Sequence, residues 1–219
     1  MKRGKFIAFE GPEGCGKSTH LPLLAAFLRE RGIEVVTTRE PGGTALAEQI
    51  RTMLQSIRDE APVPSAEVLL FLASRAQHVA KVIRPALERG AWVLTDRFED
   101  STFAYQGAGR GFDDRTLREL NRFATGGCSP DLVLLLDIPR TTGRQRLSAR
   151  QAATVTEADR FEREAELFHE RLREGFLALA REAPERYAII KTDPPREEVA
   201  RLIRAAVLAH FPEVPDAAG

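Results

Sequence analysis

A glycine-rich loop between a strand-like run and a helical pattern constrains this chain more than any other feature. The loop, Gly11-Pro12-Glu13-Gly14-Cys15-Gly16-Lys17-Ser18-Thr19, fits the pattern G-x-x-x-x-G-K-[ST]. The apolar run Lys5–Glu10 before it predicts a buried strand, and apolar residues at helical spacing follow it as far as Gly32. Such a loop lets backbone N–H groups converge on phosphate oxygens. We therefore predict that Lys17 reaches the β- and γ-phosphates of a nucleotide and that the Ser18 hydroxyl ligates Mg²⁺.

Length and composition favour one domain in a reducing compartment. The chain has 219 residues, 43% of them hydrophobic, which is enough for a single α/β domain over residues 1–219. Its 32 basic and 32 acidic residues give a net charge of +0 without long blocks of one sign, so nucleic acid is not an expected partner. The two cysteines form neither a disulfide framework nor a zinc pattern, and no apolar run approaches the ~18 residues of a membrane span. We predict a soluble, cytoplasmic protein without a membrane partner.

Strand-like and helical patterns alternate, which predicts a parallel sheet covered by helices on both faces. After Lys5–Glu10, the expected strands are Ile33–Thr38, Ala91–Thr95, Leu132–Leu136 and Tyr187–Ile190. After the helix that follows the loop, the expected helices are Thr44–Ile57, Ser65–Arg89, Asp114–Ala124, Thr141–Arg150, Ala158–Arg181 and Glu197–His210. The tail 212–219 is expected to fray.

Charged residues stand directly after the predicted strands. They are Glu10 after the first strand, Arg39 and Glu40 after the second, Asp96 and Arg97 after the third, and Asp137 after the fourth. One charged strand end is commonly a solvated rim, but ligands of such sheets bind beyond the carboxyl ends of the strands. Four charged ends on the rim that carries the loop predict a charged cleft.

Several arginines suit a second phosphate-bearing reactant, because a planar guanidinium binds phosphate bidentately. The candidates are Arg39, Arg51, Arg75 and Arg97. Arg51 and Arg75 lie on helical patterns, where a solvated surface arginine is the alternative interpretation.

A second cluster of arginines indicates a mobile lid over about residues 143–160. Arg144, Arg146 and Arg150 precede the small, polar stretch 151–157, and Arg160 follows it. These arginines could stabilise a transferring phosphoryl group, as an arginine finger does in cis. A solvated helix face followed by a loop is the alternative, and the pattern alone does not choose between the two.

Six segments together resemble the bacterial thymidylate kinases, essentially from end to end. They are Phe9–Thr19, Thr38–Thr44, Phe71–Arg75, Asp96–Gly107, Pro130–Asp137 and Asp193–Val199. The loop is shared by many nucleoside triphosphatases, whereas the second and fourth segments are far more specific. The resemblance implies a P-loop NTPase fold with a five-stranded parallel sheet. It also implies a homodimeric enzyme that transfers the γ-phosphoryl group of ATP to dTMP, with Mg²⁺, for dTTP biosynthesis.

The resemblance also implies how the nucleoside of dTMP is held. Phe71 would stack on the thymine ring in a helix that also carries Ser74, and Arg75 and Gln106 would contact the polar edge of the ring. Tyr105 would pack against the deoxyribose, where a 2′-hydroxyl would clash, and Thr102 would line the same pocket.

Further roles concern the phosphates and the metal ion. Arg97 and Arg51 would hold the acceptor phosphate, with Glu13 near that phosphate and the metal. Glu40 would orient the arginines of the pocket, and Asp96 would approach the metal through water. ATP would be bound by residues of the loop and by Arg144; the loop residues are Gly11, Pro12, Glu13, Gly14, Cys15, Gly16, Lys17, Ser18 and Thr19.

The variable positions of the loop, Glu13-Gly14-Cys15, hold no arginine. The chain therefore resembles the family branch that places a catalytic arginine in the lid. Arg150 is the first candidate for this role, with Arg146 and Arg160 behind it. The catalytic set implied is Lys17, Arg97, Glu13 and Arg150.

Two other functions remain as alternatives. Another nucleoside monophosphate kinase is the nearest enzymatic alternative, and only the residues that the resemblance assigns to the thymidine pocket argue against it. A nucleotide-dependent switch such as a GTPase would need an Asn-Lys-x-Asp segment, and the chain contains no Asn-Lys pair. The four histidines, His20, His78, His169 and His210, show no ligand spacing and receive no role.

Overall fold

The computed structural model describes residues 3–56, 60–154, 161 and 166–216, with the backbone alone for residues 150–154 and 166. Its sheet has the strand order β2-β3-β1-β4-β5, and all neighbouring strands pair in parallel. The strands are β1 (Phe6–Glu10), β2 (Val35–Arg39), β3 (Trp92–Asp96), β4 (Leu132–Asp137) and β5 (Tyr187–Lys191). The five predicted strands and the fold class are thereby confirmed, with small differences at the strand ends.

Helices connect the strands, as the alternating patterns predicted. The α-helices are α1 (Lys17–Arg29), α2 (Ala45–Gln55), α3 (Pro64–His78), α4 (Arg84–Glu88), α5 (Glu99–Thr102), α6 (Asp114–Thr125), α7 (Arg140–Thr154), α8 (Glu166–Glu182) and α9 (Arg196–His210). Two π-helical stretches, η1 (Val79–Ile83) and η2 (Phe103–Gly109), and a 3₁₀ turn, η3 (Pro184–Arg186), complete the described elements.

One helical stretch, Glu99–Gly109, lies in a segment for which the periodicity predicted no helix. Here α5 runs directly into η2. The expected helix Ser65–Arg89 is instead the continuous series α3, η1 and α4. Of the expected helix Ala158–Arg181, residues 158–160 and 162–165 lie outside the described residues, and α8 begins at Glu166.

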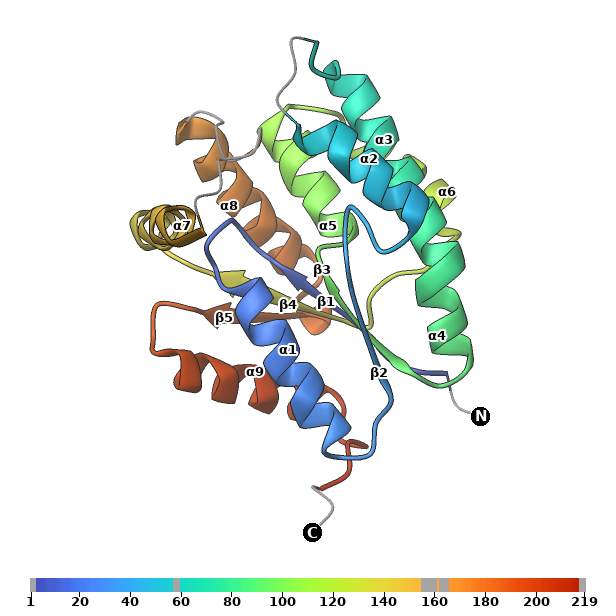
Figure 1. Ribbon diagram of the computed structural model, residues 1–219, viewed down its shortest axis with the longest axis vertical. Coiled ribbons are helices and arrows are strands. Elements are labelled where there is room, and N and C mark those ends of the chain that lie inside the picture. Colours follow the sequence, from blue (N-terminus) through green and yellow to red (C-terminus); the bar gives the residue numbers. More distant parts are fainter. Residues whose placement is uncertain (1–2, 57–59, 155–160, 162–165, 217–219) are drawn as a thin grey trace.

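The helices form two layers around the sheet (Figure 1). Helices α1 and α9 cover one face, while α8 and the series η1–α4 pack against the other. The side chains of β1 alternate between the two layers. Ile7 and Phe9 belong to a core that includes residues of α1 and α9, and Phe6 and Ala8 belong to a core with residues of η1 and α4. Both faces of β1 are therefore buried, which explains its uninterrupted apolar run.

The pairing of β1 with β3 sets the position of the site. Phe9 is level with Asp96, so the loops after these two strands leave the sheet side by side. The glycine-rich loop follows β1, and the segment that begins with Arg97 follows β3. Parallel strands thus bring together residues that lie far apart in the sequence.

The end of the chain packs near its beginning. Phe211 is buried in the core with α1, and Val214 packs against the same core. Lys5 forms an ion pair of 2.9 Å with Glu213. Residues 217–219 of the tail lie outside the described residues. Within the part of the chain that is described, no helix has the length and apolar character that a membrane crossing requires.

Candidate active site

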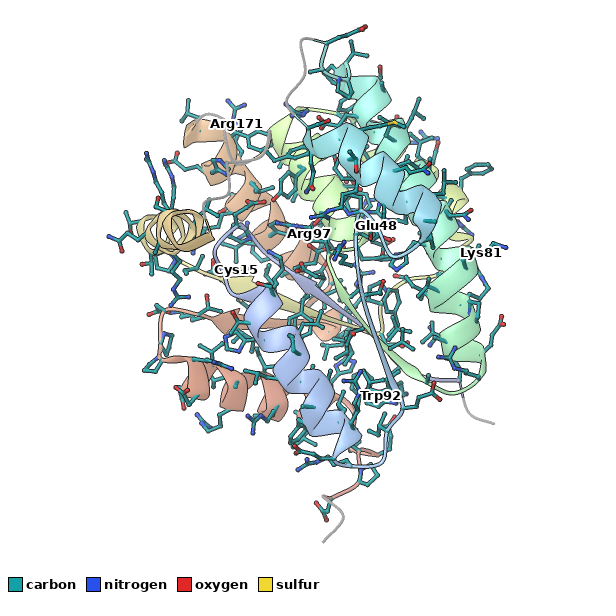
Figure 2. All side chains as sticks on the ribbon, viewed as in Figure 1. Cys15, Glu48, Lys81, Trp92, Arg97 and Arg171 are labelled. Atoms are coloured by element: carbon teal, nitrogen blue, oxygen red, sulfur yellow. The ribbon has the colours of Figure 1, made fainter. Side chains whose placement is uncertain are left out.

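A cleft of about 950 Å³ opens at the carboxyl edge of the sheet and collects most of the predicted site residues. The predicted residues that line it are Glu13, Gly14, Gly16, Lys17, Ser18, Thr19, Glu40, Arg51, Phe71, Arg75, Asp96, Arg97, Thr102, Tyr105 and Gln106. Figure 2 shows Arg97 near the middle of the molecule, between Cys15 of the loop and Glu48 of α2. Residues that follow β1, β2 and β3, together with residues of α2 and α3, therefore meet in one cavity.

The loop curls around the amine of Lys17. Gly14 and Gly16 have φ angles of 75° and 96°, in the region that favours glycine. A Cβ atom on Gly14 would lie 2.3 Å from the carbonyl oxygen of Gly143, so the close approach of α7 also requires glycine there. The Nζ atom of Lys17 donates to the carbonyl oxygens of Gly11 and Pro12, at 2.9 and 3.0 Å. The cation is thus held at the first turn of α1, where a phosphate group binds favourably.

Arg97 occupies the centre of the cleft in an unusual backbone conformation. It is the one described residue other than glycine with a positive φ, 72°. Its Nη2 donates to Glu13 Oε1 at 2.8 Å, and its Nη1 donates to the carbonyl oxygen of Gly11 at 3.1 Å. The hydroxyl of Tyr105 donates to the same Glu13 oxygen. These contacts fix the guanidinium between the loop and η2.

The charges around Glu13 keep it ionised. Burial opposes the carboxylate, but Arg97 and Lys17 outweigh this effect and lower the pKa of Glu13. Burial likewise opposes the Arg97 cation, yet the acidic groups around it, Tyr105 and Glu13 first, raise its pKa. Burial raises the pKa of Tyr105 well above its ordinary value. A carboxylate, a guanidinium cation and a neutral phenol therefore stand together near neutral pH.

Arg75 is buried rather than solvated. Its Nε donates to Glu40 Oε2 at 2.7 Å, its Nη1 donates to Thr102 Oγ1 at 2.7 Å and to Asn121 Oδ1, and its Nη2 donates to the carbonyl oxygen of Phe98 at 2.9 Å. A guanidinium has five N–H donors, so these four bonds leave one for a ligand. The interpretation of Arg75 as a solvated surface arginine is thus wrong. Its guanidinium is held in place before any ligand binds.

His78, to which the sequence assigned no role, supports the same arrangement. It is fully buried, and its Nδ1 lies 3.0 Å from Glu40 Oε1. Its Nε2 lies 2.7 Å from the hydroxyl of Thr38. The ring is thus bonded to Glu40 through Nδ1 and to Thr38 through Nε2, which fixes its orientation. Histidine spacing in the sequence gives no signal for this contact.

An aromatic wall lies at the other end of the cleft. The rings of Phe71 and Phe161 are 5.8 Å apart between centroids, and those of Tyr105 and Phe161 are 5.9 Å apart. Phe71 is only half-buried, which leaves ring surface open to the cleft. Beside it, Gln106 Nε2 donates to Glu67 Oε1 at 2.9 Å, so the amide is held in one orientation. This wall can accept a flat ring with polar edges.

Some predicted residues lie outside the lining of the cleft. They are Gly11, Pro12, Cys15, Ser74 and Arg144. Ser74 is buried and accepts from the backbone N–H of Gly42 at 3.3 Å. Burial raises the pKa of the Cys15 thiol, which fits a small packing residue. The side chain of Arg150 and the whole of Arg160 lie outside the described residues.

The prediction that four charged strand ends form one cleft is only partly correct. Arg39, Glu40, Asp96 and Arg97 line the cleft, whereas Glu10 and Asp137 do not. Glu10 is fully buried beneath the segment that follows β3, and Asp137 pairs with Arg173 at 2.6 and 2.8 Å. Packing of that segment and of α8 against the strand ends turns these two carboxylates away from the cavity.

Several lining residues were not predicted as site residues. They are His20, Pro41, Gln55, Ser101, Leu147, Phe161, Thr192, Pro194, Arg196 and Val199. Arg146 also lines the cleft, whereas Arg144 does not. Phe161 belongs to an apolar stripe typical of a core helix, so no sequence signal separates it from the core. His20 and Arg196 lie near the N-terminal ends of helical patterns, and only the tertiary packing shows that they line the cleft.

Two oxygen ligands suited to Mg²⁺ face the same cleft. The Ser18 hydroxyl is exposed at the first turn of α1, and the Asp96 carboxylate ends the neighbouring β3. Mg²⁺ commonly takes one or two protein oxygens and completes its shell with water and phosphate oxygens. The described residues contain no group of three acidic, histidine or cysteine side chains that could hold a metal ion by themselves. The donor set therefore fits a metal that arrives with a phosphate ligand.

Comparisons with known proteins agree with one another. The family model described as Thymidylate kinase matches residues 9–203. A thymidylate kinase of Desulfovibrio desulfuricans is 52% identical over 208 residues, which are 94% of this chain and 96% of the relative. One of Geobacter sulfurreducens is 49% identical over 210 residues, covering 95% and 99% of the two chains. The crystal structure of thymidylate kinase from Ehrlichia chaffeensis matches with a TM-score of 0.75 at 31% identity and covers 94% of this chain and 99% of that one.

Proposed function

Because this chain belongs to the thymidylate kinase family, we propose that its cleft holds ATP and dTMP with their phosphates meeting at Arg97. The enzyme transfers the γ-phosphoryl group of ATP to dTMP and yields dTDP and ADP, the step that supplies the diphosphate for dTTP synthesis. One observation carries the residue assignment: the glycine-rich loop, Arg97 and the aromatic wall share a single cavity.

At the donor end, the loop Gly11–Thr19 binds the phosphates of ATP through its backbone N–H groups. Lys17 leaves the loop carbonyls to contact the β- and γ-phosphates. Ser18 and, through water, Asp96 would hold Mg²⁺, which would offset negative charge on the transferred group. The proposal is supported by the exposure of Ser18 and by the position of Asp96 at the end of the adjacent strand.

At the acceptor end, Arg97 and Arg51 bind the phosphate of dTMP. Arg51 Nη1 donates to the carbonyl oxygen of Pro41 at 3.0 Å, so its guanidinium is held at the rim of the cleft. Phe71 stacks on thymine, and the remaining N–H of Arg75 and the amide of Gln106 contact its polar edge. Thr102 and Tyr105 close the pocket around the sugar, and Glu40 keeps Arg75 in place.

The chemistry needs orientation and charge more than proton removal. The acceptor oxygen belongs to a phosphate monoester, which is largely ionised near neutral pH. Glu13, ionised and bound to Arg97, therefore serves to orient the arginine and not as a general base. In-line attack on the γ-phosphoryl group then depends on holding two anions together.

The lid over about residues 143–160 supplies a further cation. Arg146 is supported by its place in the lining of the cleft. Arg150 remains our first candidate for the catalytic arginine, with Arg160 behind it, and Arg144 stays a proposed ATP contact from outside the lining. Closure of this segment would exclude water from the transferring group.

We further propose a cytoplasmic homodimer that binds small nucleotides, not nucleic acid. A cytoplasmic location is supported by the free thiols of Cys15 and Cys128 and by the use of ATP. The dimer is supported by exposed apolar side chains on α2, α3 and α6, which pack side by side. These side chains are Leu46, Met53, Leu69 and Phe123.

The test is ADP release with Mg·ATP and a panel of acceptors, namely dTMP, dUMP, dCMP, dGMP and AMP. Strong preference for dTMP is the expected result. Preference for a different monophosphate would keep the reaction type and contradict the pocket assignment. Slow ATP hydrolysis that is the same with every acceptor would contradict the kinase function and favour a nucleotide switch.

A further inference from the structure

Helix α5 begins without a cap from its own residues. The first N–H groups of a helix lack acceptors within the helix, and a polar side chain usually supplies one. The residue at the cap position is Phe98, with φ −154° and no side-chain hydrogen bond. Its backbone is buried, so water does not take this place. Within the segment itself, the N–H of Ser101 reaches the carbonyl oxygen of Phe98 at 3.2 Å, so a further acceptor must come from elsewhere in the fold.

Glu10, the last residue of β1, provides that acceptor. Its Oε1 accepts from the backbone N–H of Phe98 at 2.7 Å and from that of Ser101 at 3.2 Å. Its Oε2 accepts from the hydroxyl of Ser101 at 2.7 Å. Glu10 is fully buried and does not line the cleft. A carboxyl group on one strand thus caps a helix whose cap residue, Phe98, lies 88 residues away in the sequence.

Three consecutive residues, Phe9, Glu10 and Gly11, hold Arg97 and the segment that follows it. The carbonyl oxygen of Phe9 accepts from the backbone N–H of Arg97 at 2.9 Å, and that of Gly11 accepts from its Nη1 at 3.1 Å. Between them, Glu10 binds Phe98 and Ser101, and the Ser101 hydroxyl accepts from Arg97 Nη1 at 3.2 Å. A non-glycine residue keeps a positive φ only where its surroundings enforce it. Glu10 acts on Arg97 indirectly, through its bonds to the next residue, Phe98, and to Ser101.

The capped helix carries the acceptor pocket. From Glu99 the backbone stays helical to Gly109, and Thr102, Tyr105 and Gln106 project from it into the cleft. We propose that Glu10 is a positioning residue for acceptor binding. It fixes the start of α5 and thereby the positions of Arg97 and of the thymidine-facing side chains of α5 and η2. That the bound phosphoryl acceptor is dTMP rests on the proposed function, whereas the capping of α5 by Glu10 does not depend on it.

Asp137 offers a matched control. It ends β4, the strand next to β1, and it too carries a buried strand-end carboxyl group outside the cleft lining. Its oxygens pair with Arg173 on α8 and do not contact α5. A general cost of removing a buried carboxyl group at this edge should appear in both positions. Loss of the cap should appear only at Glu10.

The experiment compares Glu10→Ala and Glu10→Gln with Asp137→Ala and Asp137→Asn. Replacing a capping residue by alanine commonly lowers the equilibrium constant for forming the start of the helix by about tenfold. We expect Glu10→Ala to raise the KM for dTMP about tenfold and to leave the KM for ATP within about twofold. Glu10→Gln, which keeps one acceptor oxygen for the two backbone N–H groups, should recover part of this loss. An unchanged KM for dTMP in both Glu10 variants, or an equal rise in both KM values, would overturn the proposal.

Amide hydrogen exchange provides a readout that does not depend on activity. In Glu10→Gln, peptides that cover residues 98–109 should exchange faster than in the wild type, and in Asp137→Asn they should not. This measurement decides the proposal if Glu10→Ala does not fold. Wild-type exchange over 98–109 in Glu10→Gln would refute the cap. A wild-type enzyme that does not turn over dTMP would instead refute the proposed function.

Discussion

At the scale of single residues, the site depends on side chains that are oriented before substrate arrives. Arg75 has four hydrogen bonds, and the Arg97 guanidinium has three acceptors, Glu13, Gly11 and Ser101. Ordering long side chains costs conformational entropy, and this cost has already been met in the folded protein. The acceptor therefore meets a rigid set of donors, which favours reactive geometry.

Arg97→Lys tests whether the planar guanidinium of Arg97, with its several N–H donors, is needed for acceptor binding. Lysine keeps the charge but cannot bridge Glu13 and an acceptor phosphate with a planar group. Hydrogen bonds to charged groups contribute about 1.5–3 kcal/mol each, so kcat/KM for dTMP should fall about 100-fold. Steady-state kinetics with dTMP varied would measure the fall, with ATP binding followed by calorimetry. Arg118→Lys, an exposed arginine on α6, is the control, and an equal effect there would contradict the role of Arg97.

Glu10 should give the folded protein a distinctive dependence on pH. Burial and the neighbouring Asp100 raise the pKa of Glu10 from 4.5 to about 8, against the opposing influence of Arg97. Between these values the folded chain keeps a proton that the unfolded chain loses, so this contribution to stability decreases as pH rises from 4.5 to about 8. The free energy of unfolding of the wild type minus that of Glu10→Gln should therefore fall over this interval. Urea denaturation at about pH 5, 7 and 9 would measure it, and a difference that rises with pH would contradict the assignment.

At the scale of elements, the contact of α8 with η2 holds one wall of the cleft. The two helices meet where Gly175 faces Ala104 and Ala108, and a Cβ atom on Gly175 would lie 2.7 Å from that of Ala108. Phe168, Leu172 and Phe176 fill the remaining contact with the same stretch. The position of Tyr105 in the cleft thus depends on a close helix approach that only glycine allows.

Gly175→Val should separate these helices. The added side chain has no space, and overpacking of this kind costs about 1–3 kcal/mol. We expect a lower midpoint in thermal unfolding together with a higher KM for dTMP. Arg171→Val, at an exposed position of α8 labelled in Figure 2, is the matched control for the valine itself. If both variants melted alike, the contact would not have the importance assigned here.

At the scale of the whole molecule, four of the eight exposed large apolar side chains among the described residues lie on three adjacent helices. Leu46, Met53, Leu69 and Phe123 lie on the adjacent helices α2, α3 and α6, and Phe123 is 89% exposed. Exposed apolar residues gathered on neighbouring elements indicate an association surface. This face lies away from α1 and α9, which cover the opposite side of the sheet (Figure 1).

The proposed dimer predicts a solution mass of twice the 24.3 kDa of one chain. Leu69→Glu should shift the protein toward the monomer, because a charge buried at the centre of an interface is costly. Leu208→Glu, on α9, should leave the mass unchanged. Sedimentation equilibrium measures both, and a monomeric wild type at micromolar concentration would refute the dimer.

The sequence by itself determined the fold class, the glycine-rich loop and most of the residues that line the cleft. Buried parallel strands leave continuous apolar runs, and a phosphate loop requires glycines and a lysine at fixed spacing; both signals are local. The family resemblance that Arg39–Gly43 and Asp96–Gly107 carry added further site residues. One of them is Phe71, which periodicity alone would assign to the core.

Only the tertiary structure decided which polar groups face the cleft. Arg144 and Arg146 stand two residues apart on one helix and so point to nearly opposite sides, and packing brings Arg146 to the cleft. Glu10 and Asp96 end neighbouring strands, yet the first turns inward to cap α5 while the second faces the cavity. Such choices depend on contacts between segments far apart in the chain, which a local pattern does not contain.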